Sequence, residues 1–131
     1  MLRFEGKRVY LACGKTDMRK SIDGLSATVQ GSFKLNPFDD ALFVFCNRTR
    51  NRIKILEWDS DGFVIYFKRL EKGHFRWPGL HGRTVRGAND QPIPGEDAVM
   101  TLSSEELTTL LGGTKVELKL RRKEVFERRI I

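Results

Sequence analysis

Three apolar runs that follow one another closely constrain the fold of this chain more than any other feature of its sequence. They cover residues 41–46, 52–58 and 63–70, and all three are rich in β-branched and aromatic residues. The segment between the last two contains Asp61-Gly62, and an Asp-Gly pair is a strong signal of a tight β-hairpin turn. Because such short connections join antiparallel neighbours, the sequence predicts an antiparallel β-meander.

Basic and aliphatic residues alternate at the start of the middle run of the meander. Arg52 and Lys54 alternate with Ile53 and Ile55, so the cations and the aliphatic side chains should point to opposite faces of the sheet. We therefore expect one face of this strand to begin in solvent or against a ligand.

A strand and a helix are predicted before the meander. The apolar run at residues 9–13 ends at Gly14 and is typical of a strand. Thr16 is the expected N-cap of the helix, whose apolar face carries Met18, Ile22, Leu25 and Val29, and Gly31 should end it.

A second helix is predicted near the C-terminus. Ser103 and Glu106 have the spacing of a capping box, Leu107, Leu110 and Leu111 form an apolar stripe, and Gly112-Gly113 should stop the helix. Residues 115–120 alternate like a further strand. The predicted fold class is α+β, a small antiparallel β-meander sheet with one helix packed on a face, plus a C-terminal helix and tail.

The chain of 131 residues has the length of one domain. Residues 1–78 should form the core αβ meander domain, and residues 79–97 a loop or linker rich in Gly and Pro. Residues 98–131 should form the C-terminal helix and basic tail, packed on the same domain.

The composition is that of a globular domain, with 40% hydrophobic and 31% charged residues. No apolar run approaches the roughly 20 residues that a membrane helix needs, and the N-terminus lacks the apolar segment of a secretory signal, so we expect a cytoplasmic protein. Cys13 and Cys46 each lie in an apolar run without a nearby Cys or His. Buried thiols are therefore favoured over a zinc site or a disulfide.

The candidates for catalysis or nucleotide binding are weak. Gly14-Lys15-Thr16 has the form of the end of a P-loop, but Val9 stands where that motif needs its first Gly. Carboxylates that could hold catalytic metals lie mostly in expected turns, where Asp is favoured for its own backbone hydrogen bonds; they are Asp39, Asp40, Asp59, Asp61 and Glu71. His74 and His81 have no third ligand nearby. We therefore expect no enzyme activity, no metal and no cofactor.

Basic residues form the strongest constellation. The formal net charge is +7, and residues 41–78 carry eight Lys or Arg against four Asp or Glu. Such charge suits a polyanion, and a two-stranded ribbon can enter a DNA groove with Arg on phosphates and Asn on adenine. The candidate nucleic-acid-binding residues are Arg19, Lys20, Asn47, Arg48, Arg50, Asn51, Arg52, Lys54, Lys68, Arg69 and Arg76. DNA binding of this kind predicts that Arg48, Arg50, Lys54 and Lys68 share one exposed face.

The order of motifs resembles the TnpB-type accessory proteins of IS66 insertion sequences. The resemblance rests on VYLACGKTDMRKSIDGL at residues 9–25, NPF at 36–38, FVF at 43–45, NRTRNRIKIL at 47–56, WD at 58–59, DGF at 61–63, KRLE at 68–71, Gly73 and FRWP at 75–78. Two positions depart from the pattern, because Ser21 stands where Gly is usual and Cys46 where a polar residue is common. The second departure leaves DNA contact near the hairpin tip to Arg48, Arg50 and Arg52.

This resemblance implies a non-catalytic accessory role in transposition, beside a separate transposase. The implied partners are element DNA, the transposase and the other accessory protein of the element, with no membrane and with homo-oligomers possible. A pure protein-interaction module that docks on the transposase remains an alternative. A nuclease that binds metal through Asp59 and Asp61 is a further one.

Overall fold

The computed structural model describes residues 5–77 and 99–112 and the short strand at 127–129. In chain order the elements are β1 (Arg8–Ala12), α1 (Ile22–Ala27), the π-helical turn η1 (Thr28–Ser32), β2 (Ala41–Cys46), β3 (Arg52–Asp59), β4 (Gly62–Arg69), β5 (Val99–Leu102), α2 (Ser104–Leu111) and β6 (Glu127–Arg129). Neither described helix has the length and apolarity needed to cross a membrane.

The strands form one six-stranded sheet in the order β5-β1-β2-β3-β4-β6. The predicted antiparallel meander is confirmed, because β3 pairs antiparallel with both β2 and β4. The sheet as a whole is mixed, since β1 lies parallel to β2, with Leu11 opposite Val44. A parallel pair needs a long crossover, and the connection at residues 13–40, which contains α1, provides it.

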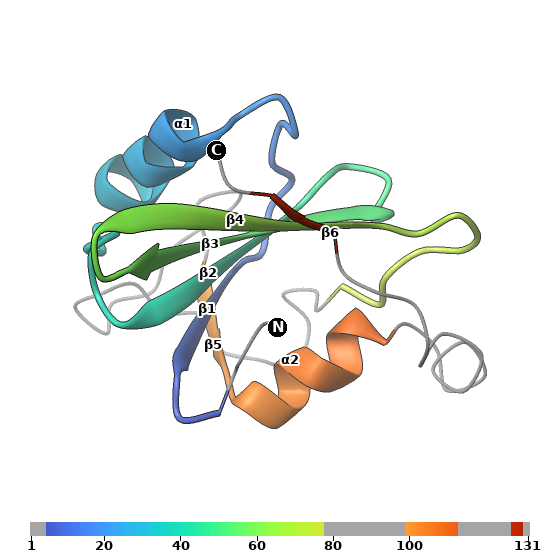
Figure 1. Ribbon diagram of the computed structural model, residues 1–131. Coiled ribbons are helices and arrows are strands. Elements are labelled where there is room, and N and C mark those ends of the chain that lie inside the picture. Colours follow the sequence, from blue (N-terminus) through green and yellow to red (C-terminus); the bar gives the residue numbers. More distant parts are fainter. Residues whose placement is uncertain (1–4, 78–98, 113–126, 130–131) are drawn as a thin grey trace.

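Both faces of the sheet are covered near its centre, and all six residues of β2 are buried. Figure 1 shows α1 above the sheet and α2 below it. Alternate residues of β2 enter two different clusters: Phe43 packs on the α1 side, whereas Leu42 packs on the α2 side. The predicted α+β fold class is thus confirmed, with one helix on each face.

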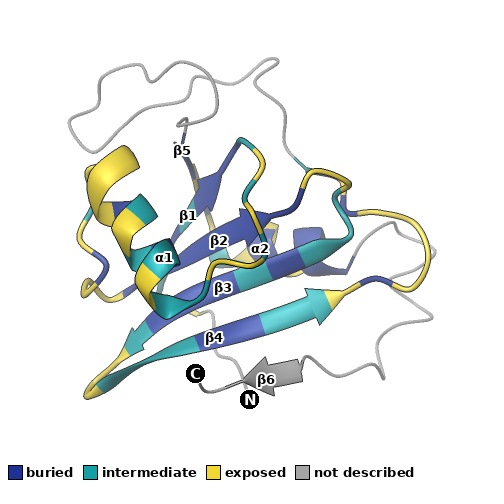
Figure 2. Cartoon of the chain, turned by 90° about the horizontal axis from the view of Figure 1, so that it is seen from above, coloured by how far each residue is buried: buried dark blue, intermediate teal, exposed yellow. Residues whose placement is uncertain are grey.

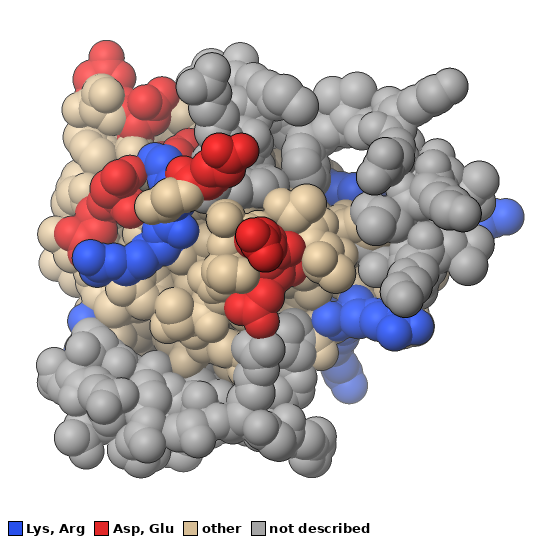
Figure 3. Space-filling view, turned by 90° about the horizontal axis from the view of Figure 1, so that it is seen from below, with Lys and Arg blue, Asp and Glu red and all other residues tan. Residues whose placement is uncertain are grey.

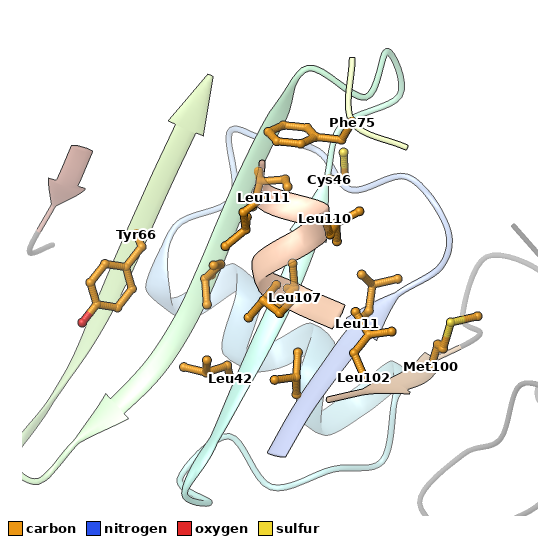
Figure 4. Close-up of a cluster of buried hydrophobic side chains, with 14 of the residues drawn as sticks. Leu11, Leu42, Cys46, Tyr66, Phe75, Met100, Leu102, Leu107, Leu110 and Leu111 are labelled. Carbon is orange, nitrogen blue, oxygen red and sulfur yellow. The ribbon is translucent and has the colours of Figure 1, made fainter. Parts of the chain in front are cut away.

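Leucines of α2 fill the lower cluster. Leu107, Leu110 and Leu111 lie among side chains from β1, β2 and β5, and Phe75 closes one end (Figure 4). The predicted capping box is present, because the Ser103 hydroxyl accepts a hydrogen bond from the Glu106 backbone N–H at 3.0 Å. The Glu106 carboxylate accepts in return from the Ser103 N–H at 3.0 Å. The helix closes at Gly112, as predicted.

The first helix begins later than its sequence predicts. The expected N-cap at Thr16 is wrong, because the Thr16 N–H donates to the carbonyl of Cys46 at the end of β2, at 2.8 Å. Asp17 then forms a turn, in which its carboxylate accepts from the Arg19 N–H at 2.9 Å and its carbonyl from the Lys20 N–H at 3.1 Å. The helix starts only after Ser21.

Two strands, β5 and β6, had no counterpart in the sequence prediction. β5 is four residues long and pairs antiparallel with β1, so the chain after residue 98 joins the same sheet. The expected linker at 79–97 and the strand-like run at 115–120 lie outside the described residues.

We expect Ser103→Ala to lower the free energy of unfolding by about 1 kcal/mol, because the Glu106 N–H at the start of α2 loses its acceptor. Urea denaturation measures the change. Ser103→Asp keeps the acceptor oxygen and should retain most of the stability; an equal loss in both variants would contradict the capping explanation.

Candidate nucleic-acid interface

A hollow with basic walls lies on the α1 side of the sheet, where β3 and β4 extend beyond the helix. Its volume is about 470 Å³, and we name it the α1-side groove. The lining residues come from the loop before α1 and from two strands; they are Asp17, Met18, Arg19, Arg52, Lys54, Ile65 and Phe67. Seen from above in Figure 2, α1 covers the inner strands and leaves much of β4 open.

The register of β3 and β4 determines which side chains face the groove. Arg52 lies opposite Arg69, Lys54 opposite Phe67, and Leu56 opposite Ile65. Directly opposite residues of an antiparallel pair point to the same face, so Arg69 extends the basic end of the groove. The polar start of β3 predicted from the sequence is therefore real, and Phe67 lies beside it.

Lys54 connects β3, on one side of the groove, to the loop before α1 on the other side. Its Nζ donates to the carbonyl of Lys20 at 2.9 Å, which holds the loop before α1 against β3. This contact brings Arg19 and Lys20 close to Arg52, although more than thirty positions separate them in the chain. Three of the predicted binding residues thus line the groove, namely Arg19, Arg52 and Lys54, and Arg69 lies opposite Arg52 at its basic end. The Lys20 ammonium is directed to the C-cap of α1 instead, where its Nζ donates to Thr28 Oγ1 at 3.0 Å.

One carboxylate also lines this groove. Asp17 pairs with the exposed Arg19, with 2.7 Å between Oδ2 and Nη2. The hydrogen bonds from the Arg19 side chain and backbone lower the pKa of Asp17 to about 2. This carboxylate therefore stays ionised at neutral pH and neutralises part of the charge of Arg19.

The Arg52–Arg69 pair places two like charges directly opposite each other. Arg69 is partly compensated, because its Nε donates to Glu71 at 2.9 Å. Within the described part of the chain, Arg52 makes no ion pair. Like charges directly opposite in a sheet are destabilising, so this pair disfavours folding.

The tip of the β2–β3 hairpin is organised by Asn47, which is buried. Its side-chain oxygen accepts from the backbone N–H groups of Asn51 and Arg52, both at 3.0 Å. Its amide nitrogen donates to Asn51 Oδ1 at 2.7 Å and Thr49 Oγ1 at 3.1 Å. The Asn47 side chain and the Asn51 side-chain oxygen are therefore occupied by the turn itself, so neither Asn can offer both its oxygen and its nitrogen to adenine.

Arg50 holds the same tip against neighbouring loops. Its backbone is left-handed, with φ at 61°, and its carbonyl accepts from the Phe75 N–H at 2.6 Å. The guanidinium donates to the carbonyl of Cys13 at 3.4 Å and lies 5.5 Å from the ring centre of Trp77. These contacts make Arg50 a structural residue of the hairpin.

The expectation that Arg48, Arg50, Lys54 and Lys68 share one exposed face is wrong. Lys68 alternates with the groove residues along β4 and points to the other face, where its Nζ donates to the carbonyl of Leu111 at 2.8 Å. Arg48 and Arg76 are exposed, outside the groove lining. On the α2 side, where grey atoms do not cover the surface, basic atoms appear only towards its margins (Figure 3).

Among the described residues, the candidate catalytic groups do not form a cluster. Cys13 and Cys46 are free and buried, and burial raises both thiol pKa values, that of Cys46 to about 11. No group of three or more His, Cys, Asp or Glu that could hold a metal occurs among the described residues. Asp59 and Asp61 are exposed and belong to the β3–β4 turn.

Sequence reasoning missed one buried ion pair and part of the groove. Glu57 is buried and pairs with Lys7 at 2.8 Å, and the Tyr66 hydroxyl donates to it at 3.1 Å. In the groove, the place of Phe67 opposite Lys54 was not predicted, although it follows once the Asp61-Gly62 turn fixes the register.

Residues 7–121 match the family described as IS66 Orf2 like protein. The chain belongs to this family of insertion-sequence accessory proteins. It is 41% identical to the uncharacterized protein y4hO of Sinorhizobium fredii over 78 residues, which cover 60% of this chain and 68% of the relative. The uncharacterized protein y4jC of the same organism is 28% identical over 117 residues, or 87% of each chain. No solved structure matches at a significant level.

We expect Asn47→Ala to lower the free energy of unfolding by about 1–3 kcal/mol, because two backbone N–H groups lose their acceptor. Arg48→Ala, the exposed neighbour, should change it by less than about 0.5 kcal/mol. Urea unfolding of the two variants compares them directly, and equal stabilities would show that Asn47 does not organise the tip.

Proposed function

We propose that this IS66-family accessory protein acts in transposition by binding DNA of its element through the α1-side groove, without catalysis. One observation carries the proposal: Arg19, Arg52 and Lys54 come from two separate chain segments and line one hollow, and Arg69 of β4 lies opposite Arg52 at its basic end. Neutralised phosphates release counterions, so clustered cations favour a polyanionic partner.

The cost of this cluster to folding supports a role in binding. The opposed Arg52 and Arg69 disfavour the sheet that carries them. A phosphate between the two guanidinium groups would relieve the repulsion and accept charge-assisted hydrogen bonds from both. The groove is thus better suited to an anion-bound state than to an empty one.

A second candidate function is docking on the transposase, and an exposed aromatic cluster favours it. Phe38 is 55% exposed, and its ring centre lies 5.0 Å from Trp58 and 5.3 Å from Phe63. Trp58 lies opposite Phe63 at the far end of β3 and β4 from the Arg pair. Rigid aromatic side chains of this kind are enriched at protein interfaces. One chain could therefore bind DNA and transposase at once.

We expect the double variant Arg52→Ala/Arg69→Ala to bind element-end DNA more weakly and with a weaker dependence on salt. The slope of log K against log salt should fall by about 1 for each phosphate that the variant no longer neutralises. Fluorescence anisotropy over a salt series measures it. Stability should stay the same or rise, because the like-charge pair is removed.

Arg8→Ala is the control that removes a cation outside the groove. Arg8 is exposed and lies opposite Ala41, at the end of the sheet away from Arg52. Wild-type affinity and slope in the double variant, or an equal loss in Arg8→Ala, would overturn DNA binding by the groove.

For the second candidate, we expect Phe38→Ala to weaken association with the purified transposase while leaving DNA affinity unchanged. Removing an exposed anchor ring reduces the apolar area at the interface and changes no charge, so the association of the wild type should also persist at high salt. Surface plasmon resonance against the transposase tests both points. Undiminished association of Phe38→Ala would exclude this cluster as the docking surface.

A further inference from the structure

We infer that the α1-side groove takes an unpaired nucleotide of single-stranded DNA, with its base stacked on Phe67. This inference rests on the proposed function and adds the form of DNA that the groove recognises. The hollow of about 470 Å³ is within the usual range of about 300–1,000 Å³ for small-molecule sites, so it suits one or a few nucleotides rather than a duplex surface.

The lining has the two components that single-strand sites combine. Phe67 and Met18 supply apolar surface, and both are half-buried while lining the hollow. Arg52 and Lys54 stand on the strand beside Phe67, with Lys54 directly opposite it. A base can stack on the ring while the adjoining phosphates meet the cations, and this combination binds strands without depending on base sequence.

The charge distribution orients the strand. The Asp17 carboxylate on the loop wall repels phosphate, whereas the Arg52–Arg69 pair at the start of β3 attracts it. The backbone of the strand should therefore run along the Arg pair, with the base directed towards Phe67 and Met18.

A regular duplex does not meet these requirements. Its bases are stacked within the helix, and one would have to leave the stack to reach a ring on the floor of the hollow. Duplex DNA could contact only the cations at the rim. The groove should accordingly prefer single strands, and Phe67 should matter only for them.

The test compares a fluorescein-labelled 20-nucleotide single strand with its duplex at one salt concentration, by anisotropy. We expect the wild type to bind the single strand about ten-fold more tightly, and Phe67→Leu to lose about ten-fold for the strand and little for the duplex. Phe63→Leu is the matched control, because it is the same change on the same strand and face, outside the groove lining.

Phe67→Trp provides a readout that is independent of any stability loss in Phe67→Leu. The indole should keep strand affinity, and its fluorescence should be quenched on binding through base stacking. If Arg52→Ala/Arg69→Ala loses binding while Phe67→Leu binds both DNA forms like the wild type, the stacking inference is overturned and the DNA-binding proposal stands. If the wild type binds neither form, both fail.

Discussion

Burial of β2 on both faces is the constraint on which the rest of the structure depends. Its six residues have no polar position, so no edge or half-exposed place in a sheet would suit them. Two strands must flank β2 and a layer must cover each face. The parallel β1 and the antiparallel β3 meet the first need, and α1 and α2 meet the second.

The α1-side groove follows from how β2 is covered. The apolar residues that need cover on the α1 side lie mainly on β1 and β2. One short helix is enough to cover them, and the outer strands are left partly uncovered. On those strands Arg52 and Lys54 replace the aliphatic residues that would have required cover. The groove therefore lies where the hydrophobic core of this face ends. Among the described residues no second helix covers β3 and β4 there, so charged side chains on these strands stay in contact with solvent.

Local patterns in the sequence predicted most of the elements and less of their arrangement. The bounds of β2 and the cap of α2 followed from residue types within a few positions of each other, such as Ser103 with Glu106. The parallel pairing of β1 and the edge strand β5 did not, because contacts distant in sequence determine them. The local sequence also failed to predict the role of Thr16, because its N–H donates to the carbonyl of Cys46, which is distant in the sequence.

The candidate site was predicted as a set of charges, and the structure divides that set by role. Alternation along β4 would have assigned Lys68 and Arg69 to opposite faces, but only after the turn at residues 59–62 had fixed the register. No local signal separates Asn47 and Arg50, which build the hairpin tip, from Arg48 beside them. Residues of one type therefore line the groove in one place and hold the hairpin together in another.

The clamped hairpin tip has a consequence for recognition. Asn47 ties the turn internally, and Arg50 fastens it to Cys13 and Trp77 from two other segments. Arg52 begins its strand directly after this clamp, so the position of its backbone is set before any ligand arrives. For the proposed binding of DNA, a backbone held in this way would lose little conformational entropy, and the adjustment of shape would be left to the DNA.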